Sequence, residues 1–217
     1  MVSSTRGPWN STIKRIGSME SLLRDNVATA LRVSAYDLKN KMKQKIMKGD
    51  IGWAPLSPLT IERKGHSKKL QDKGELVNAI KVTKVGRFAY FVGLRKDTKN
   101  RFGVSLDMIG KIQEFGKIIK PKTGRMLAIP LTKEATRLQH VFGSVRKIPG
   151  LFKLKGKKIL AMKGGKGGLK FMFVLMNKVK IKSRSFVRST ANKEMPKIKR
   201  RIVMSTEYAV KGRRYNG

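Results

Sequence analysis

The 217-residue sequence contains no cysteine, so disulfides, thiolate zinc sites and cysteine nucleophiles are excluded. It also lacks an apolar run approaching the roughly 20 residues that a membrane-spanning helix needs; the densest run, residues 171–176, has lysines close on both sides. The first residues do not follow the pattern of a secretory signal peptide. The sequence therefore predicts neither a membrane-bound nor a disulfide-stapled protein.

Residue types that carry catalysis are scarce as well. The chain has two histidines, His66 in a lysine-rich loop and His140 near a predicted helix end, and its 13 acidic residues are scattered along the chain. A metal site needs several convergent ligands, and a hydrolytic site needs a clustered acid, base or nucleophile. We therefore expect no catalytic, metal or cofactor-binding residues, no cofactor and no enzymatic activity.

Basic residues dominate what is present. Lys and Arg number 51, which gives a formal net charge of +38 at pH 7, while 40% of the residues are hydrophobic, enough for a real core. A charge of this size repels itself and favours polyanions or acidic neighbours. Between Glu134 and Glu194 there is no acidic residue at all.

This acid-free interval predicts a contact with a polyanion or an acidic partner. The sequence assigns the contact to Lys153, Lys155, Lys157, Lys158, Lys163, Lys166 and Lys170. Such lysines suit phosphate-backbone contact, which does not read nucleic-acid sequence. We expect no base stacking, because the nearby Phe152, Phe171 and Phe173 fit a hydrophobic core better.

Hydrophobic periodicity predicts long helices at both ends of the chain. Apolar residues recur every three or four positions from about Ser18 to Lys48, and again over residues 185–210, where Pro196 should cause a kink. Residues 52–60 contain Pro55 and Pro58, which predicts a loop that is neither regular helix nor central strand.

Shorter elements fill the middle. The patterns predict short helices at 75–80, 104–115 (ended by Gly116) and 132–140 (capped by Thr132). They also predict paired strands at 81–85 and 87–94, and a strand at 125–131 whose Pro130 indicates a sheet edge. A long hairpin with arms 151–162 and 169–181 should follow. In the first hairpin arm, Leu151, Lys153, Lys155 and Lys157 should share one face.

Together these elements predict an α+β fold, in which a small, mainly antiparallel sheet is flanked by the long terminal helices. We expect one structural domain over residues 1–217. Its predicted parts are an N-terminal arm (1–16), a long helix (17–48), a sheet and helix core (49–142), a basic hairpin insert (143–182), and a C-terminal helix and tail (183–217).

Four short motifs recur in an order typical of one phage protein family. They are Trp53-Ala-Pro55-Leu56 with Thr60 and Lys64; Leu70-Gln-Asp-Lys-Gly74-Glu-Leu76 with Ile80; Ile112-Gln-Glu-Phe115-Gly116; and Arg184-Ser-Phe186. This ordered set resembles the virion-morphogenesis proteins similar to the G protein of phage Mu, grouped with tail-completion or neck proteins. The chain departs from them at Gln113, where histidine is frequent, and at Ser183, where proline is frequent.

The resemblance implies a non-catalytic virion protein, assembled in the host cytoplasm, that joins head to tail as part of a ring. It implies a homo-oligomer, by analogy a hexamer, that contacts other neck and tail proteins. The motif residues Trp53, Pro55, Leu56, Gly74, Phe115, Gly116, Arg184 and Phe186 would anchor the fold, with Phe115 and Phe186 in the core. The basic face would meet DNA or an acidic ring. A nucleic-acid-binding protein of ribosomal or nucleoid-architectural type remains the alternative.

Overall fold

The computed structural model describes residues 9–50, 52–122 and 126–217, without the side chains of Arg63 and Lys166. The chain divides into two compact units, each built from separate stretches of sequence. The first comprises residues 1–50, 73–110 and 185–217, and the second residues 51–72 and 111–184. The α+β class predicted from the sequence is confirmed. The single domain over 1–217 stays a prediction, and each unit is described by itself.

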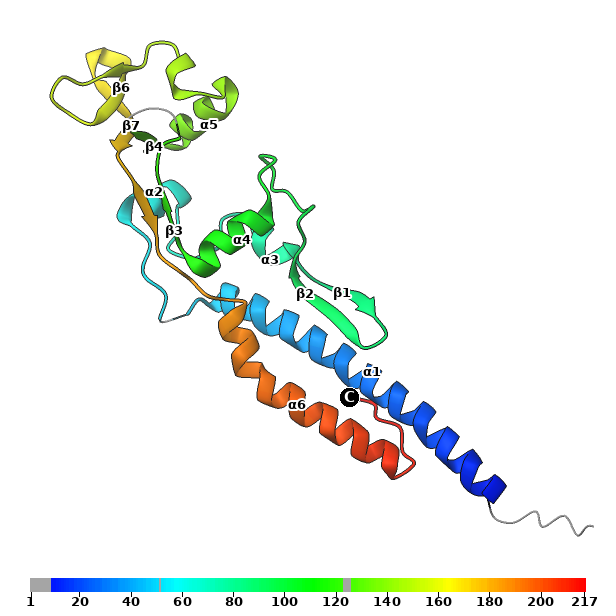
Figure 1. The fold of residues 1–217 in the computed structure, drawn as a ribbon. Coiled ribbons are helices and arrows are strands. Elements are labelled where there is room, and N and C mark those ends of the chain that lie inside the picture. Colours follow the sequence, from blue (N-terminus) through cyan, green and yellow to red (C-terminus); the bar gives the residue numbers. More distant parts are fainter. Residues whose placement is uncertain (1–8, 51, 123–125) are drawn as a thin grey trace, which may run out of the picture. The chain divides into compact units, whose positions relative to one another are not determined.

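Two antiparallel helices, α1 (Trp9–Lys48) and α6 (Arg188–Val210), lie side by side in the first unit (Figure 1). Near one end of the pair, Asn26 Nδ2 donates to the Ser205 carbonyl at 3.2 Å; near the other, Lys45 Nζ donates to Ser189 Oγ at 2.8 Å. The small residues on the buried face of α1 allow the close approach; they are Ala30, Ser34 and Ala35.

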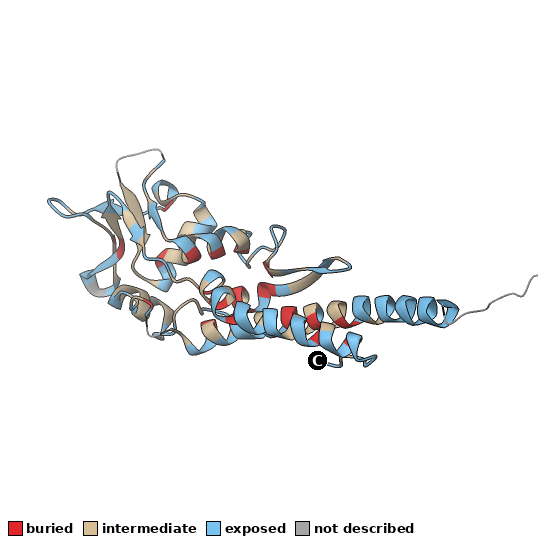
Figure 2. Cartoon of the chain, turned by 60° about the horizontal axis from the view of Figure 1, so that its bottom comes forward, coloured by how far each residue is buried: buried red, intermediate tan, exposed pale blue. Residues whose placement is uncertain are grey.

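Helix α1 begins earlier than the sequence analysis predicts. Residues 9–16 of the predicted N-terminal arm are helical, and residues 1–8 lie outside the described residues. The reason is that the three- and four-residue apolar spacing extends back through Ile16 and Ile13 to Trp9, and the single Gly17 on the way does not interrupt the helix. Figure 2 shows this first stretch exposed, whereas buried residues begin at Asn26.

A helix and a hairpin complete the first unit. Helix α3 (Glu75–Ala79) leads directly into β1 (Ile80–Gly86), which pairs antiparallel with β2 (Ala89–Leu94), as predicted. Helix α4 (Leu106–Phe115) follows, and the boundary between the units falls within it. Leu76, Val77 and Ile80 are buried.

The second unit contains a four-stranded antiparallel sheet. Strands β4 (Leu127–Pro130), β7 (Leu169–Met176), β6 (Ile159–Lys163) and β5 (Phe152–Lys153) lie in the order β4-β7-β6-β5. Pro130 therefore sits on an edge strand, as predicted. Helix α5 (Lys133–Phe142) covers one face of this sheet, over a core of Ala135, Ile148, Met172 and Phe173.

Local signals account for the helices of the second unit. Thr132 caps α5 as predicted, its Oγ1 accepting from Ala135 N–H at 3.0 Å. The prediction that residues 52–60 contain no helix is wrong, because α2 (Pro58–Lys64) has Pro58 in its first turn, where no N–H is needed. Ser57 caps α2 by accepting from Thr60 N–H at 3.3 Å. Two 3₁₀ turns, η1 (Val145–Lys147) and η2 (Gly165–Gly167), flank the sheet strands.

The long hairpin predicted over 151–181 is wrong in two respects. Its first arm folds back on itself, because residues 154–158 form a turn between β5 and β6 in which Gly156 has φ +71°, a conformation that glycine adopts easily. The end of its second arm, β8 (Val179–Ile181), leaves the sheet and pairs antiparallel with β3 (Lys117–Ile119). C-terminal helix α6 begins at Arg188 rather than Ser185.

Candidate functional site

Three of the four motifs that carry the family resemblance contribute residues to one cluster in the second unit. Arg184 lies at its centre: its N–H donates to the Gln113 carbonyl at 2.6 Å, its Nη1 to Gln113 Oε1 at 3.1 Å and its Nη2 to the Ala54 carbonyl at 3.4 Å. Ser183 Oγ donates to the Glu114 carbonyl at 2.6 Å. We call this cluster the motif junction. It joins segments that are up to 130 residues apart in sequence.

Burial shapes the chemistry of the Arg184 side chain. Desolvation lowers the pKa of its guanidinium, which nevertheless stays protonated at neutral pH because arginine starts so high. Among the described residues, its Nε is buried and donates to no acceptor. The two side-chain hydrogen bonds go to an amide oxygen and a backbone carbonyl, so this arginine ties loops together. These contacts account for Arg184 as a structural residue.

The end of α4 passes very close to the chain after β8. Gly116 has φ +74°, and a Cβ built on it would lie 2.9 Å from the Ile181 carbonyl oxygen and 3.0 Å from Ser183 N. A side chain here would press on backbone atoms at both contacts. This position therefore needs glycine for its conformation and also for its lack of volume.

Trp53 anchors the loop at the other side of the motif junction. Its side chain is 6% exposed, and Lys69 Nζ donates to its carbonyl at 2.6 Å. Leu56 is half-buried, whereas Pro55 is exposed. The anchoring of this loop thus comes from the indole and from the lysine that follows along the chain, a contact that the sequence analysis did not identify.

Two other motif residues belong to the first unit. Gly74 has φ +76° and precedes α3, and Phe186 is completely buried. The prediction that Phe115 lies in the core is wrong: its side chain is 62% exposed at the last position of α4. Hydrophobicity alone does not determine burial at a helix end, where the chain turns away.

The candidate polyanion-binding lysines divide into groups instead of forming one face. Lys155, Lys157 and Lys158 are exposed on the turn between β5 and β6, which we call the lysine turn, while Lys163 lies at the opposite end of β6. The alternating face predicted for residues 151–157 is wrong because a turn, not a strand, carries two of its members. The Lys166 side chain lies outside the described residues.

Lys153 and Lys170 lie on the face of the sheet opposite to the one that carries Lys163. Lys153 pairs with Leu160 and Lys170 with Met162, whereas Lys163 pairs with Leu169 on the opposite face. Lys170 forms an ion pair with Glu134 of α5, and this lysine lowers the pKa of that carboxyl. Of the seven lysines, Lys170 is therefore already compensated, whereas the lysine turn holds three exposed lysines within four residues.

Two phenylalanines that sequence reasoning assigned to the core are exposed. Phe173 is fully buried as expected, but Phe152 is 38% and Phe171 47% exposed. Both pair with the buried Ala161, so they flank it on the sheet face that also carries Lys163. For Phe171, alternation could not reveal this, because a bulge between Leu160 and Ala161 shifts the register of β6 against β7.

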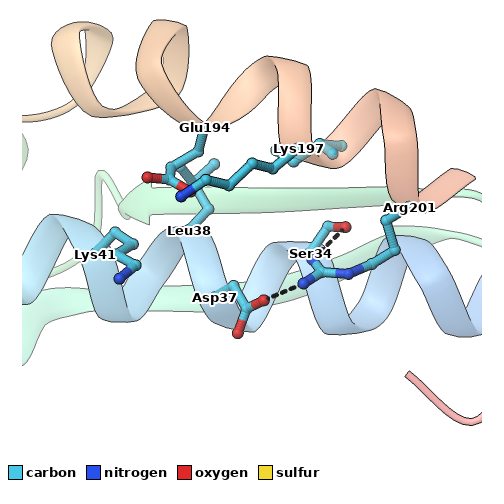
Figure 3. Close-up of a pocket in the computed structure, with 8 residues that line it drawn as sticks. Ser34, Asp37, Leu38, Lys41, Glu194, Lys197 and Arg201 are labelled. Carbon is cyan, nitrogen blue, oxygen red and sulfur yellow. Dashed lines mark hydrogen bonds and ion pairs between the residues drawn. The ribbon is translucent and has the colours of Figure 1, made fainter.

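A shallow pocket of about 200 Å³ lies between α1 and α6 in the first unit (Figure 3). Arg201 reaches across it, with Nη1 donating to Ser34 Oγ at 3.0 Å and Nη2 to Asp37 Oδ2 at 2.6 Å. Glu194, 9% exposed, pairs with Lys197 at 3.2 Å. These ion pairs compensate the charges of Asp37 and Glu194, so we interpret the pocket as a polar joint between the two helices.

Neither the metal-binding nor the membrane-spanning arrangement occurs in the part of the chain that the structure describes. Within residues 9–50, 52–122 and 126–217, no three potential ligands from His, Asp and Glu gather closely enough to hold a metal ion. None of the described helices combines the length and the apolar run that crossing a bilayer requires.

Comparison of the chain with models of protein families, with curated proteins and with solved structures found no match.

Proposed function

We propose that this protein is a structural component of a phage virion that joins tail to head as a ring around the DNA path. The observation that supports the proposal best is the motif junction. Three motifs that lie far apart in sequence and resemble a neck family supply residues to one hydrogen-bonded cluster centred on Arg184. Motifs matched by chance would have no reason to meet in this way.

In this role the chain acts without catalysis. Identical subunits that use a heterologous interface must close into a ring or grow into a filament, and a tail of sixfold symmetry would favour a hexamer. The subunits would contact other neck and tail proteins in the virion. The motif junction would fix the loops of each subunit that meet these neighbours.

In this ring, the lysine turn would bind DNA independently of the DNA sequence. Lys155, Lys157 and Lys158 are exposed, and no acidic residue lies within the 135–193 interval to compensate them. Phosphate neutralisation by such lysines is strongly salt-dependent. The same observation supports the alternative function, a nucleic-acid-binding protein of ribosomal or nucleoid-architectural type.

Native mass spectrometry of nuclease-treated protein, with negative-stain imaging of the same samples at low and high salt, separates the two functions. A discrete ring, or a monomer that forms one when tail tubes are added, supports the neck role. A protein that forms no ring at any salt and instead recaptures RNA or duplex DNA at low salt refutes the neck role in favour of the alternative.

A second experiment tests the motif junction and the lysines separately in the assembling phage. Arg184→Ala should reduce ring formation, because it frees loops that the arginine holds. Replacing Lys153, Lys155, Lys157 and Lys158 with Gln should leave the isolated subunit folded but reduce DNA retention in particles. An unchanged yield of infectious particles for both variants would contradict the proposal.

A further inference from the structure

The first part of α1 carries a stripe of apolar side chains that are exposed in the part of the chain that the structure describes. Its members are Trp9, Ile13, Ile16, Met19 and Leu23, which are 75%, 64%, 58%, 43% and 37% exposed. We call these five residues the α1 stripe. Beyond the hydrogen bond between Asn26 and Ser205, α1 continues for 17 residues, about 25 Å, to Trp9, and it extends past the end of α6 (Figures 1 and 2).

The α1 stripe continues an interface that already exists. Trp9, Ile13, Ile16, Glu20 and Leu23 follow each other at spacings of four and three, and Val27, Ala30 and Ser34 extend the same series into the part of α1 that is buried or half-buried. A series alternating four and three is the pattern of a helix that packs along its length against other helices. Among residues 9–50 and the other described residues, α6 packs against one half of this helical face, and the half from Trp9 to Leu23 is exposed.

We propose that a second copy of this chain occupies the α1 stripe, through antiparallel pairing of the two α1 helices centred near Ile16. This pairing is independent of the proposed neck function, because it rests on α1 alone.

Charge favours a second copy over a foreign partner at this site. Residues 9–25 contain three basic and two acidic residues, whereas residues 135–193 contain sixteen basic and none that is acidic. A chain of net charge +38 repels its own kind over most of its surface. At the nearly balanced start of α1, two copies can approach without the repulsion that the acid-free interval would cause.

The sequence of the stripe is symmetric about its centre. Trp9 and Leu23 lie seven residues on either side of Ile16, and Ile13 and Met19 lie three on either side. In an antiparallel pair, each apolar residue therefore meets another apolar residue of the second copy.

The single acidic member of the series distinguishes the two directions. A parallel pair would place Glu20 against Glu20 of the second copy, two like charges in an apolar seam. The antiparallel pair instead places Glu20 opposite Thr12, within one helical turn of Arg15 of the second copy. In the single chain, Glu20 already forms an ion pair with Arg24.

The size of the stripe fits a reversible pair. At the exposures given above, the five side chains leave roughly 500 Å² per copy to be covered, so pairing buries about 1,000 Å² in total. That is near the lower bound of specific interfaces, where association depends on protein concentration.

The test uses full-length, nuclease-treated protein at high salt, in analytical ultracentrifugation over a wide concentration range. Ile16→Glu should weaken dimerisation at least about 100-fold, because each copy would bury a charge facing its counterpart. Ser21→Glu adds the same charge to the same exposed stretch away from the stripe and should leave the dimer intact. Equal effects of the two variants, or a monomer at every concentration, would overturn the proposal.

Tryptophan fluorescence gives an independent readout. The chain has two tryptophans, and Trp53 is already buried. The variant Trp53→Phe therefore reports on Trp9, whose emission should shift to shorter wavelength as concentration rises and stay constant when Ile16→Glu is added. An emission maximum that ignores concentration while dimers form would place the interface elsewhere and refute the pairing.

Direction is tested by cross-linking, for which the absence of cysteine leaves a clean background. With a short bifunctional thiol reagent, Trp9→Cys chains should not link to each other, because the antiparallel pair separates the two sites by about 20 Å. Trp9→Cys mixed with Leu23→Cys should form the cross-linked heterodimer. Self-linking of Trp9→Cys would instead establish a parallel pair. Because the pairing and the ring are separate proposals, a ring that still assembles with Ile16→Glu leaves the neck role standing even where the dimer is lost.

Discussion

Replacing Gly116 with alanine tests the close approach at the motif junction. Gly116 follows the last residue of α4 with φ +74°, and Gly143 follows the last residue of α5 with φ +65° in the same unit. A Cβ on Gly143 would meet nothing within 4 Å, but one on Gly116 would meet two backbone atoms at 2.9 and 3.0 Å. The pair therefore separates the cost of the left-handed backbone from the cost of the crowding.

We expect Gly143→Ala to lower the free energy of unfolding by about 1 kcal/mol, the cost of an L-residue in the left-handed region. Gly116→Ala should lose about 3 kcal/mol, since its methyl group also displaces backbone that is held by the Lys117–Ile181 pairing and by the bond from Ser183 Oγ to the Glu114 carbonyl. For a chain of this size, these losses correspond to falls in Tm of about 3 and 9 °C.

Urea and thermal unfolding followed by circular dichroism measure both variants beside the parent. Each loss should appear as a shift of the midpoint with an unchanged denaturant slope, because the surface exposed on unfolding stays the same. If the two variants lose equal stability, the crowding between α4 and the end of β8 does not exist, and the account of Gly116 is wrong.

Three further predictions concern charge. The triple variant in which the lysines of the lysine turn become Gln should bind duplex DNA more weakly and reduce the slope of log K against log salt by about 2.7, which fluorescence anisotropy across a salt series measures; a slope equal to that of the parent would remove the lysine turn from the DNA contact. Because Lys170 lowers the pKa of Glu134, their ion pair stabilises the fold above the ordinary glutamate pKa, and this stabilisation is lost as pH falls through the lowered pKa. Lys170→Gln should therefore be less stable than the parent at pH 7 and equally stable at the acid end of the range. A difference in stability that persists at acid pH would contradict the predicted direction of the pH dependence. Arg201→Ala, which removes the bonds to Ser34 and Asp37, should lower the free energy of unfolding by about 1–2 kcal/mol in chemical denaturation, whereas an unchanged midpoint would show that the α1–α6 pair does not depend on this polar joint.

Much of the fold follows from local signals in the sequence. The β1–β2 hairpin, the start of α5 at Thr132 and the edge position of Pro130 were predictable, because alternation, a capping hydroxyl and a missing N–H act within a few residues. The α+β class follows from the same elements. The predicted N-terminal arm over residues 1–16 made the first helix too short, although Asn10, Ser11 and Thr12 are residue types that occur readily in a first helical turn.

The wrong predictions concern places where contacts between distant parts of the chain determine the structure. The turn at residues 154–158 depends on the pairing of β6 with β5 and β7, and the exposure of Phe171 depends on a bulge that no alternation pattern encodes. For the candidate site, the sequence supplied the motif residues but not their meeting, since the Arg184 contacts span up to 130 residues. The contribution of Lys69 carries no sequence signal of its own.

The pairing of α1 with α6 has a consequence for synthesis of the chain. Asn26 and its hydrogen-bond acceptor Ser205 are 179 residues apart, so at ordinary elongation rates α1 leaves the ribosome roughly 10–40 s before the helix that covers it. During that interval both apolar halves of α1 are exposed on a nascent chain. Neighbouring ribosomes on one message would then hold uncovered α1 helices side by side, and a chaperone or another nascent copy would be the first partner that each of them meets.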